Sequence, residues 1–247
     1  MFTHHRLKVY EKALALGAGA QEFSGCWGRR HAIVEHFRRA SESIVLNIAE
    51  GARLVSGTDK AKTLDYALGS TLECAACLDI VSIKGRLKGE RLLIEKRRFL
   101  EVARMLVGLR NAWLQGVMSE EPGSYRVKSE PSTGRVEVLF HHESLDVYQV
   151  GLDFMRWFVG LPGGGELSDR LCREIDKSAT SLVLNVAEGN GRYSELDHRR
   201  FLEIAAASSV KATAYLDLYE QKALPARVEI NQGRELLSRI VAMLSRF

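Results

Sequence analysis

The chain has 247 residues, of which 46% are hydrophobic and 27% charged, with a formal net charge of +4. This composition is typical of a folded soluble protein and excludes a mostly disordered chain. Only 4 prolines occur, where average usage of roughly 5% would give about 12, so long helices are favoured. No uncharged apolar run reaches about 18 residues, which argues against a transmembrane helix.

The cysteine content and the N-terminal region indicate the compartment. Four cysteines are too few for a disulfide framework, and reduced thiols are the default inside the cell. The short alanine- and glycine-rich run 13–20 resembles part of a secretory signal, but a related segment, 145–159, lies in the middle of the chain. We therefore expect a cytoplasmic protein with no membrane partner.

The first half of the chain aligns with the second half at an offset of 138 residues without a gap. The segment Ser43-Ile-Val-Leu-Asn-Ile-Ala-Glu-Gly51 corresponds to Ser181-Leu-Val-Leu-Asn-Val-Ala-Glu-Gly189, and seven of these nine positions are identical. A repeat of this length indicates a duplicated domain rather than a solenoid unit.

Each copy is predicted to contain four helices. Ser56 and Ser194 each precede an acidic residue by three positions, which predicts helix N-caps, and Gly51 and Gly189 predict the ends of the preceding helices. The predicted helices span residues 7–24, 29–52, 58–84 and 89–115 in copy one and 145–160, 167–190, 195–222 and 226–246 in copy two.

The predicted fold is all-α, with two tandem antiparallel up-down four-helix bundles joined by a linker. Long helices with short loops pack as antiparallel neighbours, which favours this bundle topology. Copy one is assigned to residues 1–118 and copy two to residues 140–247. The segment 119–139 between them contains proline, glycine and mixed charges without helical periodicity, as a linker does.

Polar side chains recur on one stripe of the second predicted helix of each copy. They are Ser43, Asn47 and Glu50 in copy one and Ser181, Asn185 and Glu188 in copy two. Around this stripe the helix is apolar on most sides, which predicts burial against its own bundle and against a second copy, either within this chain or from another chain. We interpret the stripe as a hydrogen-bonded layer, because a buried polar group without a partner is costly. The alternative is that the glutamate carboxylate binds a metal ion or acts as a base.

The same residues carry a resemblance to a known family. The pattern Ala40-Ser-Glu-Ser-Ile-Val-Leu-Asn-Ile-Ala-Glu-Gly51, together with Phe201-Leu-Glu-Ile-Ala-Ala-Ala-Ser208, resembles the four-helix-bundle proteins encoded by 23S rRNA intervening sequences. It is also similar to the accessory variability determinant of diversity-generating retroelements. The chain departs from the family pattern in three ways. Copy two has Lys211 where copy one keeps the usual glutamate as Glu73, and copy one has Thr63 where copy two has Phe201. The chain is also a fusion of two domains.

The resemblance implies a non-enzymatic bundle that needs no cofactor and assembles into a ring-like homo-oligomer, pentameric in known cases. For the retroelement accessory protein it implies nucleic-acid binding through a basic channel. Fusion of two unequal copies would require a different ring closure. The expected partners are therefore further copies of the chain, or one copy docked on the other, and RNA or DNA. No small-molecule substrate is expected.

Charge is divided unevenly between the copies. Residues 1–118 carry 19 basic and 12 acidic side chains, a net charge of +7, whereas residues 140–247 carry 13 and 15, a net charge of −2. Copy one is therefore a candidate nucleic-acid surface. Its candidate residues are Lys84, Arg86, Lys88, Arg91, Lys96, Arg97, Arg98 and Arg104. The alternatives are a solvated ion-paired face and docking of the oppositely charged copies.

Two cysteines form a Cys-x-x-Cys pair at Cys74 and Cys77. No second pair accompanies it, so neither zinc binding nor redox chemistry is expected. His4 and His142 match at the repeat offset and are interpreted as solvated or capping residues, with a paired metal site as the alternative.

An enzymatic alternative rests on Arg30 and His36, whose spacing is similar to the Arg–His pair of some helical-bundle ribonucleases. Copy two has Ser168 and Glu174 at these positions, so the pair is not a property of the repeat. We therefore predict no catalytic residue and no metal ligand.

Overall fold

The computed structural model describes residues 2–24, 32–116, 138–161, 163–165, 167, 169–222 and 227–246, and these residues contain no strand. Copy one contains α1 (Lys8–Ser24), α2 (Ala32–Arg53), α3 (Gly57–Ile83) and α4 (Gly89–Leu114). Copy two contains α5 (Asp146–Gly160), α6 (Arg170–Asn190), α7 (Glu195–Lys222) and α8 (Arg227–Leu244). A short 3-10 turn precedes α1 at Thr3–Arg6 and another precedes α5 at His141–Ser144. The predicted all-α fold with two tandem bundles is confirmed, while most of the predicted linker lies outside the described residues.

Local signals explain where the third helix of each copy begins. The Ser56 hydroxyl accepts a hydrogen bond from the Asp59 amide at 3.3 Å, and the Ser194 hydroxyl accepts one from the Asp197 amide at 3.3 Å. Each serine therefore satisfies one of the amides that a helix N-terminus leaves without a partner. Both predicted N-caps are confirmed.

The predicted role of two glycines is wrong. Gly51 and Gly189 do not end their helices, because α2 continues to Arg53 and α6 continues to Asn190. A Cβ atom on Gly51 would lie 2.3 Å from the Thr63 hydroxyl oxygen, and one on Gly189 would lie 2.9 Å from the Phe201 Cβ. The glycines therefore allow the second and third helices of each copy to pack closely.

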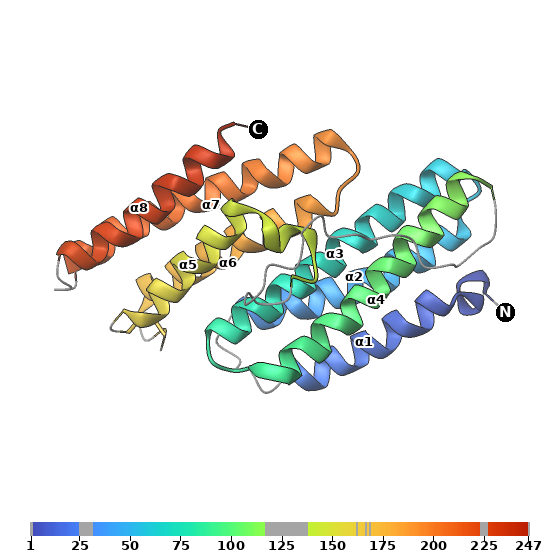
Figure 1. The fold of residues 1–247 in the computed structure, drawn as a ribbon, viewed down its shortest axis with the longest axis horizontal. Coiled ribbons are helices and arrows are strands. Elements are labelled where there is room, and N and C mark those ends of the chain that lie inside the picture. The colour runs from blue at the N-terminus through green and yellow to red at the C-terminus, as the bar shows by residue number, and fades with distance from the viewer. Residues whose placement is uncertain are drawn as a thin grey trace.

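The two bundles lie side by side and share one boundary (Figure 1). The third helix of copy one, α3, forms much of this boundary: it packs against α2 and α4 in its own bundle and against α6 and α5 of the other. We call this contact between α3 and α5/α6 the internal junction. Because α3 is surrounded in this way, buried residues occur on every side of it.

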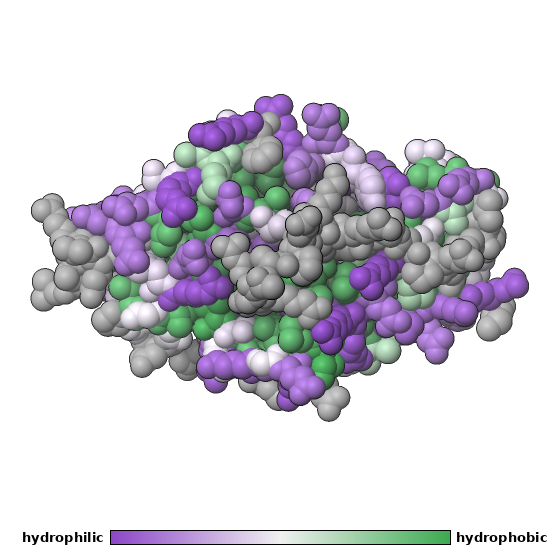
Figure 2. Space-filling view, in the orientation of Figure 1, coloured by the Kyte–Doolittle hydropathy of each residue, from purple (hydrophilic) through white to green (hydrophobic). Residues whose placement is uncertain are grey.

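The apolar character of α3 follows from this position. By length and composition it is apolar enough to cross a membrane, but 72% of its most apolar window is buried inside the protein. That burial is the behaviour of a core helix. On the molecular face seen in Figure 2, hydrophobic side chains form patches between hydrophilic ones.

The predicted double burial of the second helix is present within the chain for α6, whereas the outer face of α2 is open in a single chain. The core-facing Ile44 of α2 and its repeat equivalent Leu182 of α6 are both buried. On the outer face, Leu184 of α6 is 2% exposed because α3 covers that side, whereas its repeat equivalent Leu46 on α2 is 67% exposed. One copy thus has its outer face covered within the chain and the other does not.

Candidate functional site at the internal junction

A hydrogen-bonded polar layer joins the second and third helices within each copy. In copy one the Ser43 and Ser70 hydroxyls lie 2.8 Å apart, and the Asn47 amide donates to the Ser43 carbonyl oxygen at 2.8 Å. Copy two repeats this geometry, with 2.9 Å between the Ser181 and Ser208 hydroxyls and 2.7 Å from the Asn185 amide to the Ser181 carbonyl oxygen. The serine and asparagine of the shared motif therefore stabilise each bundle internally.

The motif glutamate of copy two has a different role, because it lies at the internal junction. Glu188 on α6 accepts a hydrogen bond from Arg192, whose guanidinium also packs over the Tyr66 ring of α3 at 4.9 Å. Burial and the nearby Glu73 carboxylate raise the pKa of Glu188 to about 7. Glu73 is itself 3.2 Å from His36 Nδ1 on α2. Side chains of both copies therefore meet in one charged cluster, which we call the Glu73–Glu188 cluster.

The raised pKa of Glu188 predicts a pH-dependent stability. Its ordinary pKa is 4.5 and its folded pKa is about 7, so the folded chain retains a proton that the unfolded chain has already lost. The free energy of unfolding should therefore fall as pH rises from about 4.5 to about 7. Glu188→Gln should reduce the total change in the free energy of unfolding over this pH range by on the order of 2 kcal/mol.

Urea unfolding of wild type and variant at several pH values between 5 and 8 measures this slope. Glu50→Gln alters the exposed repeat equivalent on α2 and should leave the slope unchanged. A slope that persists in Glu188→Gln would show that another group is responsible.

A second charged cluster lies at the other end of the internal junction. Lys96 on α4 is buried, and its ammonium lies 2.6 Å from Asp79 on α3 and 2.6 Å from Glu143 in the turn before α5. The Tyr148 hydroxyl donates to the second oxygen of Asp79 at 2.9 Å. Burial alone would lower the pKa of Lys96, but the two carboxylates outweigh it and raise that pKa. We call this arrangement the Lys96 lock.

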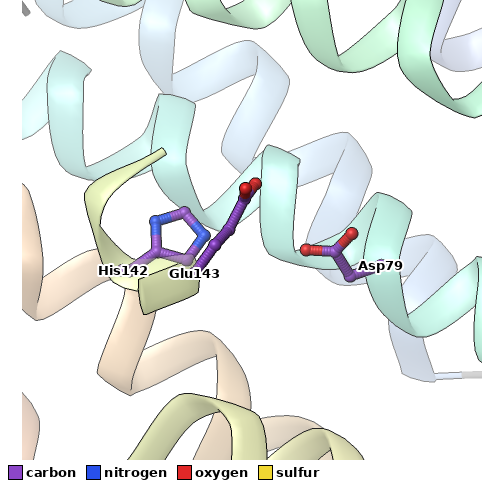
Figure 3. Close-up of side chains that lie close together, drawn as sticks. All are labelled: Asp79, His142 and Glu143. Carbon is purple, nitrogen blue, oxygen red and sulfur yellow. The ribbon is translucent and has the colours of Figure 1, made fainter. Parts of the chain in front are cut away.

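The Lys96 lock includes a triad that resembles a metal site. Ligand atoms of Asp79, His142 and Glu143 lie within 4.8 Å of one another, and Figure 3 shows Glu143 reaching from its turn toward α3. His142 is fully buried, and neither of its ring nitrogens has a hydrogen-bond partner in the described part of the chain. However, Lys96 already supplies the positive charge between the two carboxylates. Burial, reinforced by Lys96, lowers the pKa of His142 well below its usual range, so its ring is neutral.

Two further contacts fix how closely the bundles approach. Lys84 at the end of α3 forms an ion pair with Asp176 on α6, and both side chains are almost fully buried. A Cβ atom on Gly191 would lie 2.8 Å from the Gly69 Cα atom, so the two backbones are in direct contact there. The internal junction therefore depends on specific ion pairs and on two glycines, in addition to apolar packing.

The predicted nucleic-acid surface loses two of its eight members. Lys84 and Lys96 are buried in ion pairs at the internal junction and do not lie on the surface. The remaining six side chains are exposed on α4 or in the loop before it. These are Arg86, Lys88, Arg91, Arg97, Arg98 and Arg104. Acidic neighbours are present as well, since Arg98 lies 3.1 Å from Glu95.

The other sequence candidates are placed as follows. Cys74 and Cys77 are fully buried, and burial raises the pKa of both thiols well above its usual value. His36 is paired with Glu73, while Arg30 lies outside the described residues. His4 stacks on Phe2 and is partly exposed, whereas its repeat equivalent His142 is buried.

Several residues of the internal junction were missed by the sequence analysis. Asp176, Glu143 and Arg192 are ordinary charged residues there, and only their partners in the other copy give them a role. One signal was available, because Asp176 and Arg192 replace Arg38 and Leu54 of copy one. Differences between the copies, rather than their identities, mark the internal junction.

Comparison with known proteins agrees with the duplicated architecture. A family model described as 23S rRNA-intervening sequence protein matches residues 5–108 and, a second time, residues 143–246. No curated protein and no solved structure matches the chain.

Proposed function

The chain belongs to the family of 23S rRNA-intervening sequence proteins as a tandem member, and from this premise we propose that it is a non-enzymatic helical scaffold that associates with further copies of itself. The observation that carries the proposal is the unequal burial of equivalent faces. Leu72 on α3 is 0% exposed in the internal junction, whereas its equivalent Val210 on α7 is 58% exposed. Exposed apolar side chains at positions that are buried elsewhere in the same fold mark an interaction surface.

The charged clusters support a structural rather than a catalytic role. Lys96 is held between two carboxylates, and Arg192 is held by Glu188 and by aromatic rings. Each cluster joins elements of the two copies, so each stabilises the arrangement of the bundles. Groups committed to ion pairs in this way are poor candidates for proton transfer to a substrate.

Light scattering across a range of protein concentrations tests the scaffold. We expect the mass to rise above the 27.6 kDa of one chain as concentration increases. Leu46→Asp should shift this rise to higher concentration, because a charge would be placed on an exposed apolar face. Ile94→Asp on α4, which changes an exposed apolar residue outside that face, should not. A mass of one chain at every concentration would contradict the proposal.

We propose nucleic-acid binding by copy one as a second function, supported by the six exposed basic residues on and before α4. Affinity for RNA or DNA should fall steeply with salt, because bound counterions are released. Changing Arg91, Arg97 and Arg98 to Glu should weaken binding. It should also reduce the slope of the logarithm of the binding constant against the logarithm of the salt concentration by up to about three. The same changes at Arg156, Lys177 and Arg239 of copy two serve as the control, and an equal effect there would contradict a site on copy one.

A further inference from the structure

We infer that α7 of one chain packs against α1 and α2 of the next chain, in the arrangement that α3 adopts on α5 and α6 within the chain. This inference rests on the proposed self-association and names its surfaces and its partner, a second copy of this chain. We call the new contact the external junction. Because the two surfaces differ, the contact is head to tail.

The apolar faces required for the external junction are present and uncovered. On α7, Val210 and Leu218 are exposed, whereas their equivalents on α3, Leu72 and Ile80, are fully buried. On the opposite surface, Leu46 of α2 is exposed where Leu184 of α6 is buried. Leu14 of α1 is likewise exposed, whereas Leu152 of α5 is buried. Both halves of an apolar contact are therefore left open, one at each end of the chain.

Charge exchange at the repeat equivalents makes these two faces complementary. In the internal junction, Glu73 and Glu188 lie near each other, and Arg192 and His36 accompany them. In the external junction, Lys211 of α7 takes the place of Glu73 and faces Glu50, the equivalent of Glu188. The sequence therefore replaces two neighbouring carboxylates with an attractive pair.

The accompanying positions change in step. Leu54 takes the place of Arg192, and Glu174 takes the place of His36. The positive charge that Arg192 contributes to the internal junction is thus absent, and Lys211 supplies one from the other side.

The Lys96 lock is rebuilt in a similar way. Arg234, the equivalent of Lys96, is bound by Asp217 at 2.6 Å and by Glu220 at 2.6 Å, so both acids come from α7. The turn before α1 carries His5 where the turn before α5 carries Glu143. The turn before α1 of the next chain therefore brings no third acidic residue to Arg234, which already has two acidic partners.

The external junction should be weaker than the internal one. Ala207 and Arg53 replace Gly69 and Gly191, so the backbones cannot approach as closely. Arg38 replaces Asp176, which removes the buried pair formed with Lys84. Its potential like-charge neighbour Lys222 is already bound by Asp169 at 2.7 Å. We therefore expect reversible, concentration-dependent association.

A charge-exchange experiment on the full chain tests this geometry by analytical ultracentrifugation. Glu50→Lys alone and Lys211→Glu alone should each raise the dissociation constant at least about tenfold, because each places like charges opposite one another. An equimolar mixture of the two variants should return to within about threefold of wild type, because every junction between unlike chains again pairs opposite charges. Glu90→Lys and Lys177→Glu, which are exposed elsewhere, make the same changes of net charge and serve as controls.

The outcomes separate this inference from the proposed function. Restoration in the mixture, together with unchanged association of the controls, supports the external junction. If wild type associates but neither Glu50→Lys nor Lys211→Glu alters the association, the scaffold stands and the head-to-tail geometry is wrong. Weakened single variants that the mixture fails to restore also overturn the pairing of Glu50 with Lys211. A wild-type chain that never associates overturns both proposals.

Discussion

Lys96→Met should lower the free energy of unfolding by about 3–5 kcal/mol, because it leaves buried carboxylates without their counter-charge. Asp79 and Glu143 each lie 2.6 Å from the ammonium that this substitution removes. Methionine retains most of the length of the side chain, so the loss reports charge rather than packing. Urea unfolding at neutral pH measures it.

The control for this prediction is Arg98→Met on the same helix. Arg98 is exposed and lies 3.1 Å from Glu95, so its removal should change stability by less than about 0.5 kcal/mol. Burial raises the pKa of Glu143, and Lys96→Met removes the positive charge that opposes this rise, so the variant should regain stability relative to wild type as pH falls. A loss of less than about 1 kcal/mol in Lys96→Met would show that the lock does not stabilise the chain.

The second large effect is expected at the other buried ion pair. Asp176→Leu should cost about 3–5 kcal/mol, because Lys84 would then be buried without a partner. The double variant Lys84→Met/Asp176→Leu should recover to within about 1 kcal/mol of wild type, since replacing a whole buried pair with apolar groups is often neutral.

Urea unfolding of the two single variants and the double variant gives the coupling between the residues. Lys222→Met removes the repeat equivalent of Lys84, which forms an exposed pair with Asp169, and should cost less than about 1 kcal/mol. Simple addition of the two single effects in the double variant would mean that Lys84 and Asp176 do not interact in solution.

Much of the fold could be predicted from the sequence because its signals are local. Helix periodicity, the N-caps at Ser56 and Ser194, and the gapless repeat depend on neighbouring residues or on simple alignment. The spacing of Ser43 and Asn47 likewise placed them on one stripe of a helix. These patterns do not depend on how the bundles pack against each other.

The errors arose where the role of a residue depends on a distant part of the chain. Lys84 and Lys96 belong to a basic stretch that is typical of a surface, yet Lys84 pairs with Asp176 of copy two, and Lys96 pairs with Glu143 of copy two as well as with Asp79. Leu46 and Leu184 are identical residues at equivalent positions, and only the neighbouring bundle distinguishes them. Periodicity in one copy carries no information about which copy covers its outer face.

The shared motif combines two roles that its spacing alone does not separate. Its serine and asparagine bond within a copy, as Ser181 and Asn185 do, while Glu188 reaches the other copy. Among the residues that the structure describes, Glu50 meets no such partner, because the outer face of α2 is open there. The glutamate is therefore the member of the motif whose surroundings depend on whether another bundle packs against the copy.

Equivalent faces thus differ in burial, because they are covered between the two copies and open on α1, α2 and α7. Thiol labelling of single cysteines tests it most directly, with Leu46→Cys compared with Leu184→Cys, and Val210→Cys compared with Leu72→Cys. In dilute solution we predict rapid labelling at positions 46 and 210 and strong protection at positions 184 and 72, with positions 46 and 210 becoming protected as concentration rises. Equal labelling rates at positions 46 and 184 would contradict the account.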